Sequence, residues 1–183
     1  MRPLAVAVTG GIGAGKSETL RSFERHGVPV CSSDEIVHRL IAHDPDVRAA
    51  LEQRFGTTDR ARIGEIVFAD REELSWLEAL LHPRVREEYL AWLEGLDATV
   101  SVVEIPLLYE TGADALFDAV VVVTAPEELR AARAPVPLAA RSSRLIPDDE
   151  KVRRADFSYV NDGSLEELDA FVERVLAELA RGV

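Results

Sequence analysis

Hydrophobic residues in this chain follow two patterns, short continuous runs and longer segments in which they recur every three or four positions. The continuous runs are typical of strands buried on both faces of a parallel sheet. The apolar run is unbroken at residues 4–8 and 120–123, and strands are predicted over residues 4–8, 28–31, 99–104, 118–124 and 157–160. Because helical patterns separate these runs, we expect an α/β fold with three layers and a doubly wound parallel sheet of about five strands.

A glycine-rich turn, GGIGAGKS at residues 10–17, joins the first predicted strand to a helix predicted over residues 17–26. It fits G-x-x-x-x-G-K-[ST], in which glycines let backbone N–H groups surround phosphate oxygens and the helix N-terminus faces the same anion. A turn that only connects two elements is disfavoured, because the preceding strand, the Lys-Ser pair and the following helix all fit a phosphate-binding loop. We expect Lys16 to reach the phosphates and Ser17 to bind Mg²⁺. The expected nucleotide-binding residues of this P-loop are Gly10, Gly11, Ile12, Gly13, Ala14, Gly15, Lys16 and Ser17.

The chain next passes through Ser32 and Ser33 to Asp34 and into another helical pattern. Ser33 or Asp34 could cap that helix, because both side chains can accept hydrogen bonds from N–H groups of a first helical turn. Asp34 also follows a predicted strand, at the edge of a nucleotide cleft, where the hydroxyl of a phosphoryl acceptor needs a general base. The sequence fits both roles equally.

The longest helical pattern lies between the second and third predicted strands, with apolar stripes through residues 46–96. Gly56 and the pair His82–Pro83 interrupt it, and Pro83 suits the first position of a helix. Such stripes are more often core than ligand site, although small-molecule kinases keep their acceptor-binding lobe at this place in the fold. His82 could contact an acceptor or hold the start of a helix, and we favour the structural role.

Two further groups of charged residues suit phosphoryl transfer. Glu104 ends the third predicted strand and could contact Mg²⁺ directly or through water. Arginines gather between Arg130 and Arg154. A solvated surface loop would explain them, but arginines on a mobile flap would also cover the transferring phosphoryl group and neutralise its charge.

Composition narrows the possible classes of function. A length of 183 residues suits one domain with an insertion, and the net charge of −12 disfavours a general nucleic-acid binder. The only cysteine, Cys31, excludes an internal disulfide and favours a cytoplasmic protein. No apolar stretch is long enough to cross a bilayer. We therefore expect a small-molecule partner, with no nucleic acid or membrane partner, while the oligomeric state is not readable.

Several segments together resemble the dephospho-coenzyme A kinase family. They are TGGIGAGKS at 9–17, RARIGEIVFAD at 60–70, LEALLHPRV at 77–85, EIPLLYETG at 104–112 and ADFSYVNDGS at 155–164. The resemblance runs from end to end. It implies that ATP, with Mg²⁺, phosphorylates the ribose 3′-hydroxyl of dephospho-CoA to give coenzyme A and ADP.

The resemblance also implies roles for particular residues. Asp34 matches the second Asp of the family's D-x-D and would take the hydroxyl proton, while Lys16 and a lid arginine such as Arg141 would act on the phosphoryl group. Asn161 and Gly163 would lie near adenine. The implied organisation is a single kinase domain over 1–183, with a core of 1–33, 99–133 and 155–183, a helical acceptor-binding insertion of 34–98 and a lid of 134–154.

The sequence departs from the family pattern at several places. Ser32 stands where the first Asp of D-x-D is usual, Leu145 replaces a usual Gln, and Arg130 and Arg133 are spaced by three instead of four. These departures leave open a catalytically weakened homologue, and the P-loop also fits another small-molecule or nucleotide kinase. A switch of the GTPase kind is disfavoured, because D-x-x-G after a strand and N-K-x-D are both missing.

Overall fold

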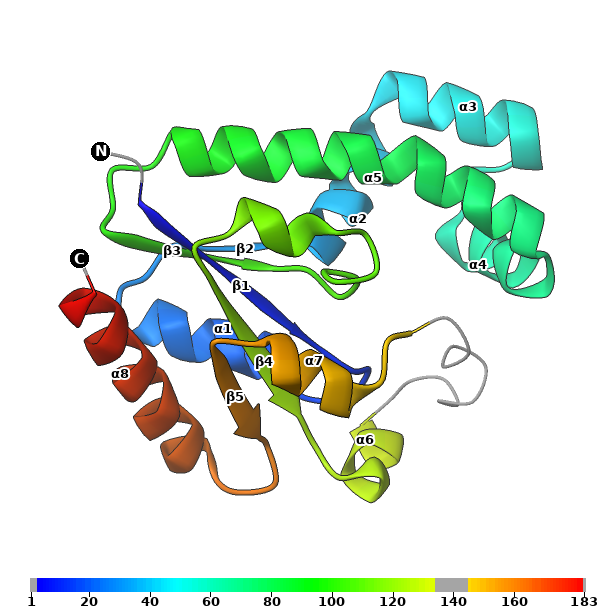
Figure 1. The fold of residues 1–183 in the computed structure, drawn as a ribbon. Coiled ribbons are helices and arrows are strands. Elements are labelled where there is room, and N and C mark those ends of the chain that lie inside the picture. Colours follow the sequence, from blue (N-terminus) through cyan, green and yellow to red (C-terminus); the bar gives the residue numbers. More distant parts are fainter. Residues whose placement is uncertain (1–2, 134–144, 183) are drawn as a thin grey trace. The chain divides into compact units, whose positions relative to one another are not determined.

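A parallel sheet of five strands, in the order β2-β3-β1-β4-β5, organises the computed structural model, which describes residues 3–133 and 145–182 (Figure 1). The strands are β1 (Leu4–Gly10), β2 (Val30–Ser32), β3 (Val100–Glu104), β4 (Ala119–Thr124) and β5 (Phe157–Val160). The central strand β1 is nearly all buried, which fits its continuous apolar sequence. The predicted α/β class with a parallel sheet is confirmed.

Strand β1 is two residues longer than its apolar run predicted. Thr9 and Gly10 pair with Val122 and Val123 of β4, so the neighbouring strand extends the ladder beyond Val8. Apolar character marks burial and not hydrogen bonding, and it therefore missed these two positions. The P-loop consequently starts at the carboxyl end of a strand that has partners on both sides.

Strand β2 begins later than predicted, at Val30 instead of residue 28. The N–H of Val28 donates to the carbonyl of Phe23, 3.1 Å away, and closes the end of the preceding helix after Gly27, whose φ is +75°. Pro29 has no N–H, although its carbonyl accepts from Val102 at 2.9 Å. The apolar run at 28–31 therefore serves first as a helix end and then as a strand.

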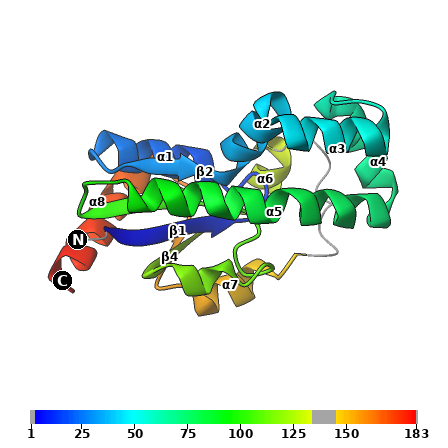
Figure 2. The ribbon, with the colours of Figure 1, turned by 90° about the horizontal axis from the view of Figure 1, so that it is seen from above.

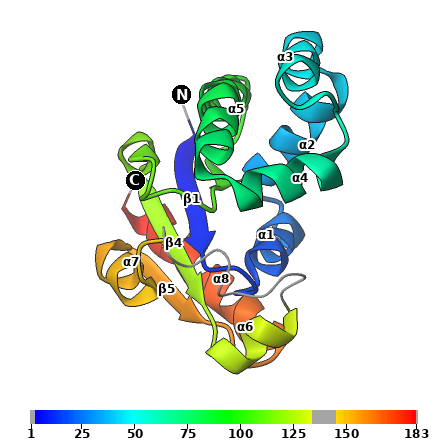
Figure 3. The same cartoon turned by 90° about the vertical axis from the view of Figure 1, so that its right-hand side faces the viewer.

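The chain forms two compact units, residues 1–31 with 96–183 and residues 32–95. The first unit contains the sheet, with α1 (Lys16–Arg25), the 3₁₀ turn η1 (Ala113–Leu116), α6 (Glu127–Arg133), α7 (Asp148–Arg154) and α8 (Leu165–Arg181). Figures 2 and 3 show α1 and α8 on one face of the sheet and α7 on the other. Phe23 of α1 and Leu168 of α8 are fully buried in the core with Val6 and Val121.

The second unit contains four helices. They are α2 (Ser33–His43), α3 (Pro45–Phe55), α4 (Arg60–Ala69) and α5 (Arg71–Glu94). Within this unit α2 and α4 pack against α5, and α3 packs against α2. Aspartates that accept hydrogen bonds from first-turn N–H groups cap three of the helices, and these are Asp44, Asp59 and Asp70. No helix in the described part of the chain is long and apolar enough to cross a membrane.

The prediction that Pro83 starts a helix is wrong, because Pro83 lies inside α5. The helix begins at Arg71, where the Asp70 cap satisfies the N–H groups of Glu72 and Glu73. Proline removes one helical hydrogen bond, but the apolar positions before and after it, such as Leu81 and Val85, are both buried. Burial of a continuous apolar face thus outweighs the cost of the proline.

Helix α7 was not predicted, because its sequence was taken as part of a lid over residues 134–154. A buried ion pair fixes it: Nζ of Lys151 lies 2.7 Å from Oε1 of Glu110, in the loop after β3. The Lys151 side chain is 1% exposed and that of Glu110 12% exposed. The same oxygen accepts from the N–H of Ile146, just before α7, so Glu110 holds this helix at two points.

Replacing Lys151 should destabilise the protein strongly. In Lys151→Met the buried Glu110 carboxylate loses its cation, and we expect the free energy of unfolding to fall by about 3–5 kcal/mol. Urea denaturation would measure this loss. The double variant with Glu110→Gln should recover part of it, while Arg153→Met, which breaks the exposed Arg153–Asp149 pair on the same helix, should change little. Equal losses of unfolding free energy in Lys151→Met and Arg153→Met would show that the buried pair does not hold α7.

Candidate active site

Within the candidate site, the side chain of Lys16 contacts the backbone of its own P-loop. Nζ of Lys16 donates to the carbonyls of Gly10 at 3.2 Å and Gly11 at 3.3 Å. In a trans peptide the carbonyl and the next N–H point in opposite directions, so Lys16 also orients the N–H groups of Gly11 and Ile12. These carbonyl contacts hold two peptides of the loop in fixed orientations.

Arg130, from α6, makes a second contact with the loop. Its Nε–H donates to the carbonyl of Ile12 at 3.0 Å, and its Nη1 donates to Oδ2 of Asp148 at 2.6 Å. By the same trans-peptide geometry this bond orients the N–H of Gly13. The sequence marked this arginine only as the first of a cluster that runs to Arg154, and the structure places it on the loop itself.

Asn161, which follows β5, makes a third contact. Its Nδ2 donates to the carbonyl of Ala14 at 2.9 Å, and the residue is 9% exposed. Gly15 leaves the space for this amide, because a Cβ there would lie 2.0 Å from Nδ2 and its φ of +101° is unfavourable for other residues. The structure thus shows Asn161 on the outer side of the P-loop, and a contact with adenine stays a prediction.

The N-terminus of α1 supplies further groups for an anion. Gly15 precedes the helix, Lys16 is its first residue, and the exposed Ser17 lies in its first turn. The first N–H groups of a helix have no partner within it, and the helix dipole is positive at this end. Ser17 therefore offers a hydroxyl beside an anion-binding helix end, which suits a metal ion that bridges to phosphates.

Glu104 lies at the carboxyl end of β3, opposite Val8 of β1, and is 5% exposed. Its Oε1 lies 3.9 Å from Nζ of Lys16. A carboxylate oxygen is a ligand that Mg²⁺ accepts directly or through water. No cluster of three or more His, Cys, Asp or Glu side chains suited to a metal occurs among residues 3–133 and 145–182. The donors present thus fit a metal held partly by a bound phosphate.

Asp34 lies in the second unit, exposed in the first turn of α2. The prediction that Ser33 or Asp34 caps this helix is wrong: the cap position is Ser32, whose side chain makes no capping hydrogen bond. Ser32 still has the extended backbone of β2, so the helix starts one residue earlier than expected. Asp34 therefore does not cap the helix, although a carboxylate in the first turn still interacts favourably with the helix dipole. The role of general base stays a prediction.

The remaining predicted site residues lie in different surroundings. Arg141 falls outside the described residues. Nη1 of Arg133 donates to the carbonyl of Asn161 at 3.3 Å. At Gly163 a Cβ would lie 1.7 Å from Oε2 of Glu167, which accepts from the N–H of Ser164 in the capping box of α8. Glycine at 163 is therefore explained by helix capping, and its contact with adenine is untested.

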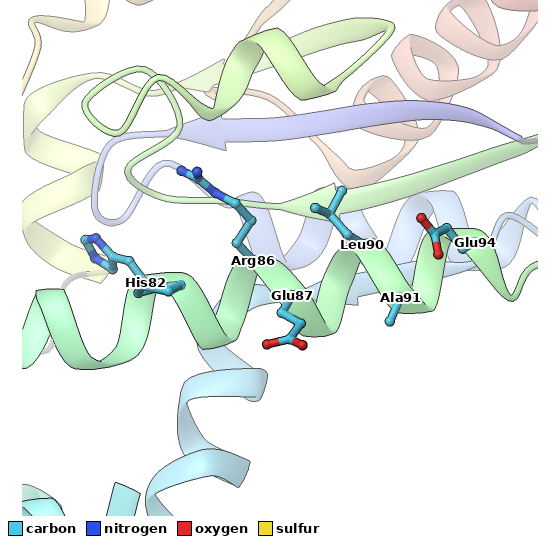
Figure 4. A pocket seen from close by; sticks show the side chains of 7 residues that line it. His82, Arg86, Glu87, Leu90, Ala91 and Glu94 are labelled. Atoms are coloured by element: carbon cyan, nitrogen blue, oxygen red, sulfur yellow. The ribbon is translucent and has the colours of Figure 1, made fainter.

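A hollow runs along α5 in the second unit (Figure 4). Its lining residues are His82, Pro83, Arg86, Glu87, Leu90, Ala91 and Glu94. Arg86, Leu90 and Glu94 lie on one side of the helix in this view, as their spacing of four requires. Partial burial lowers the pKa of His82, with Glu78 opposing and Arg86 adding to the decrease. The preference for His82 at a helix start is wrong, because it lies in the middle of α5.

Sequence reasoning missed the contacts that hold the P-loop from outside. The glycine pattern identified the loop, but nothing in the sequence showed that Arg130 and Asp148, 18 residues apart, would pair. The sequence contains one weak indication of the role of Asn161, because this residue directly follows a predicted strand. Ligands bind at the carboxyl ends of the strands in an open parallel sheet.

Comparison with known proteins gives one consistent result. The family model described as CoaE, dephospho-CoA kinase, matches residues 4–167. A dephospho-CoA kinase of Rhodopseudomonas palustris (strain BisB18) is 40% identical over 192 residues, covering 96% of each chain. Among solved structures, a Thermus thermophilus protein, TT1252, has a TM-score of 0.83 at 34% identity and covers 98% of this chain and 99% of its own. The dephospho-CoA kinase from Campylobacter jejuni has a TM-score of 0.72 at 28% identity, covering 98% of each chain.

Replacement of Asn161 should weaken nucleotide binding. In Asn161→Ala the carbonyl of Ala14 loses its donor, and we expect stability to fall by about 1–3 kcal/mol. The Kd for a non-hydrolysable ATP analogue should rise, since the next N–H of the loop is less well oriented, and titration calorimetry would measure it. Asp162→Ala, at the adjacent exposed position, is the control. An unchanged Kd in Asn161→Ala would show that this bond does not shape the loop.

Proposed function

We propose that this chain, which belongs to the dephospho-CoA kinase family, transfers the γ-phosphoryl group of ATP to the 3′-hydroxyl of the ribose in dephospho-CoA. The family consists of ATP-dependent kinases, so the chain is an ATP-dependent phosphotransferase. The observation that carries the acceptor assignment is the similarity over the whole length, which includes the helical unit of residues 32–95 as well as the P-loop. Coenzyme A and ADP are the products.

The P-loop residues 10–17 hold the phosphates of ATP in this proposal. Bonds from Lys16, Arg130 and Asn161 to the loop carbonyls support it, because they direct N–H groups to the opposite side of the loop. Lys16 adds a positive charge for the β- and γ-phosphates. Preorganised donors of this kind stabilise the charge of the transferring group without reorganising during the reaction.

Ser17 and Glu104 would hold Mg²⁺, which supplies neutralisation of phosphate charge when bound. Ser17 contributes its hydroxyl at the start of α1, and Glu104 its carboxylate at the end of β3. Mg²⁺ commonly takes one or two protein ligands, with substrate phosphates and water completing its coordination. The proposal therefore requires no larger cluster of acidic residues.

Asp34 would accept the proton of the ribose hydroxyl as the hydroxyl oxygen attacks the γ-phosphorus. The bond between the γ-phosphorus and the leaving ADP breaks in the same step. The exposed carboxylate of Asp34, which caps no helix, supports this role. Residues 34–98 would hold the acceptor. An arginine of the segment 134–154, with Arg141 our candidate, would stabilise the equatorial oxygens of the transferring group.

A catalytically weakened homologue is the second candidate, and Ser32 is the observation that favours it. Where the resembled family usually has the first Asp of D-x-D, this chain has a hydroxyl. A lost carboxylate would reduce turnover without preventing ATP binding. Measuring turnover and binding separately distinguishes the two candidates.

The identity of the acceptor can be tested with purified protein, ATP and Mg²⁺. We expect dephospho-CoA, in a panel that also contains nucleosides, nucleotides and sugar acids, to release ADP in amounts equal to the coenzyme A formed. A coupled ADP assay and chromatography of the products would measure both. Removal of Mg²⁺ with a chelator should stop the reaction. ADP release with another acceptor alone would overturn the assignment, and none at all with normal ATP binding would favour the weakened homologue.

Loss of the Asp34 carboxylate should separate chemistry from binding. We expect Asp34→Asn to lower kcat by about two to four orders of magnitude, the range for a general base, and to leave the Kd of an ATP analogue unchanged. Glu35→Gln makes the same chemical change at the next exposed residue of α2 and should keep its activity. The two variants differ only in which carboxylate is removed, so similar kcat values would refute the role of Asp34.

A further inference from the structure

The guanidinium of Arg130 links three parts of the first unit. It belongs to α6, donates from Nε to the Ile12 carbonyl of the P-loop at 3.0 Å, and donates from Nη1 to Asp148 of α7 at 2.6 Å. The Arg130 side chain is 21% exposed and that of Asp148 27% exposed. Because a charged hydrogen bond in such a partly buried place is stronger than one in water, Asp148 restricts the orientation of the guanidinium.

The P-loop has room for this arginine only because of its glycines. A Cβ on Gly11 would lie 2.6 Å from Nη2 of Arg130, and a Cβ on Gly13 would lie 2.5 Å from the Arg130 carbonyl oxygen. The side chain and the backbone of α6 therefore pack directly on the loop. A change in the direction of the guanidinium would be felt by the Ile12–Gly13 peptide, to which it is bonded.

Asp148 is itself held in place by the anchoring of α7. Lys151, three residues later, is paired with Glu110 in a buried site, and the N–H of Ile146 donates to the same carboxylate at 3.1 Å. These contacts lie on both sides of Asp148 in the sequence. The carboxylate that orients Arg130 is thus attached to a fixed helix and not to a freely moving surface chain.

We propose that Asp148 is a positioning residue for nucleotide binding, which fixes Arg130 and through it the Ile12–Gly13 peptide of the P-loop. The N–H of Gly13 then keeps the direction opposite to Arg130. Asp148 has no contact with the phosphates in this role. The pair neutralises itself, so Arg130 contributes orientation of the loop more than positive charge. This inference rests on the proposed binding of ATP at the P-loop.

Asp148 and its neighbour Asp149 offer a matched pair of variants. Asp149 pairs with Arg153 on the exposed side of α7, so Asp149→Asn makes the same chemical change without touching Arg130. We expect Asp148→Asn to raise the Kd of a non-hydrolysable ATP analogue about three- to tenfold, the size of one lost hydrogen bond, and Asp149→Asn to leave it unchanged. The KM for dephospho-CoA and the Tm should be the same in both variants.

A double variant tests whether Asp148 acts through Arg130. In the background of Arg130→Met, which cannot donate to Ile12, Asp148→Asn should have no further effect on the Kd. Equal Kd values for Asp148→Asn and Asp149→Asn would overturn the inference, and so would additive effects in the double variant. A lower Tm together with a loss of affinity for both the ATP analogue and dephospho-CoA would also overturn it. If the wild-type protein bound the analogue but did not turn over dephospho-CoA, the proposed acceptor alone would be wrong, and the Kd comparison would still decide the role of Asp148.

Discussion

The candidate site depends on hydrogen bonds that side chains donate to the carbonyls of the P-loop. Lys16 supplies two of these bonds from the loop itself, whereas Arg130 and Asn161 come from segments that follow β4 and β5. Because each trans peptide couples its carbonyl to the N–H on the opposite side, these bonds direct donors toward the place where an anion is expected. The glycine sequence permits the shape of the loop, and the pairing of β1, β4 and β5 brings the side chains that maintain it.

Helix α7 connects this constraint to the loop that follows β3. Its Asp148 holds Arg130 against the P-loop, and its Lys151 pairs with Glu110, six residues after the proposed metal ligand Glu104. The Lys151–Glu110 pair is buried and therefore sensitive to the loss of one partner, whereas the side chains of Arg130 and Asp148 are 21% and 27% exposed. A change in the position of α7 would therefore alter both the P-loop and the loop after β3, although these loops follow different strands.

The sequence predicted what depends on local pattern and missed what depends on distant partners. Short apolar segments predicted all five strands, but the extension of β1 to Gly10 required knowledge of its partner β4. Pro83 misled the helix assignment because local preference was outweighed by burial along α5. In the candidate site the P-loop pattern and the family resemblance identified the phosphate loop. The pairs Arg130–Asp148 and Lys151–Glu110 join residues 18 and 41 positions apart, and no periodicity encodes such contacts.

The charge distribution explains how so acidic a chain can bind a polyanion. The net charge is −12, and cations at the P-loop have carboxylates close by, Glu104 for Lys16 at 3.9 Å and Asp148 for Arg130 at 2.6 Å. These two carboxylates reduce the positive field that Lys16 and Arg130 produce at the P-loop. Oriented backbone N–H groups and the N-terminus of α1 act within a few ångströms and carry no net charge that neighbouring acids could cancel. The field of a dipole falls off faster with distance than that of a charge, so these groups depend on an accurate loop geometry. This dependence gives the outer bonds of Arg130 and Asn161 their importance.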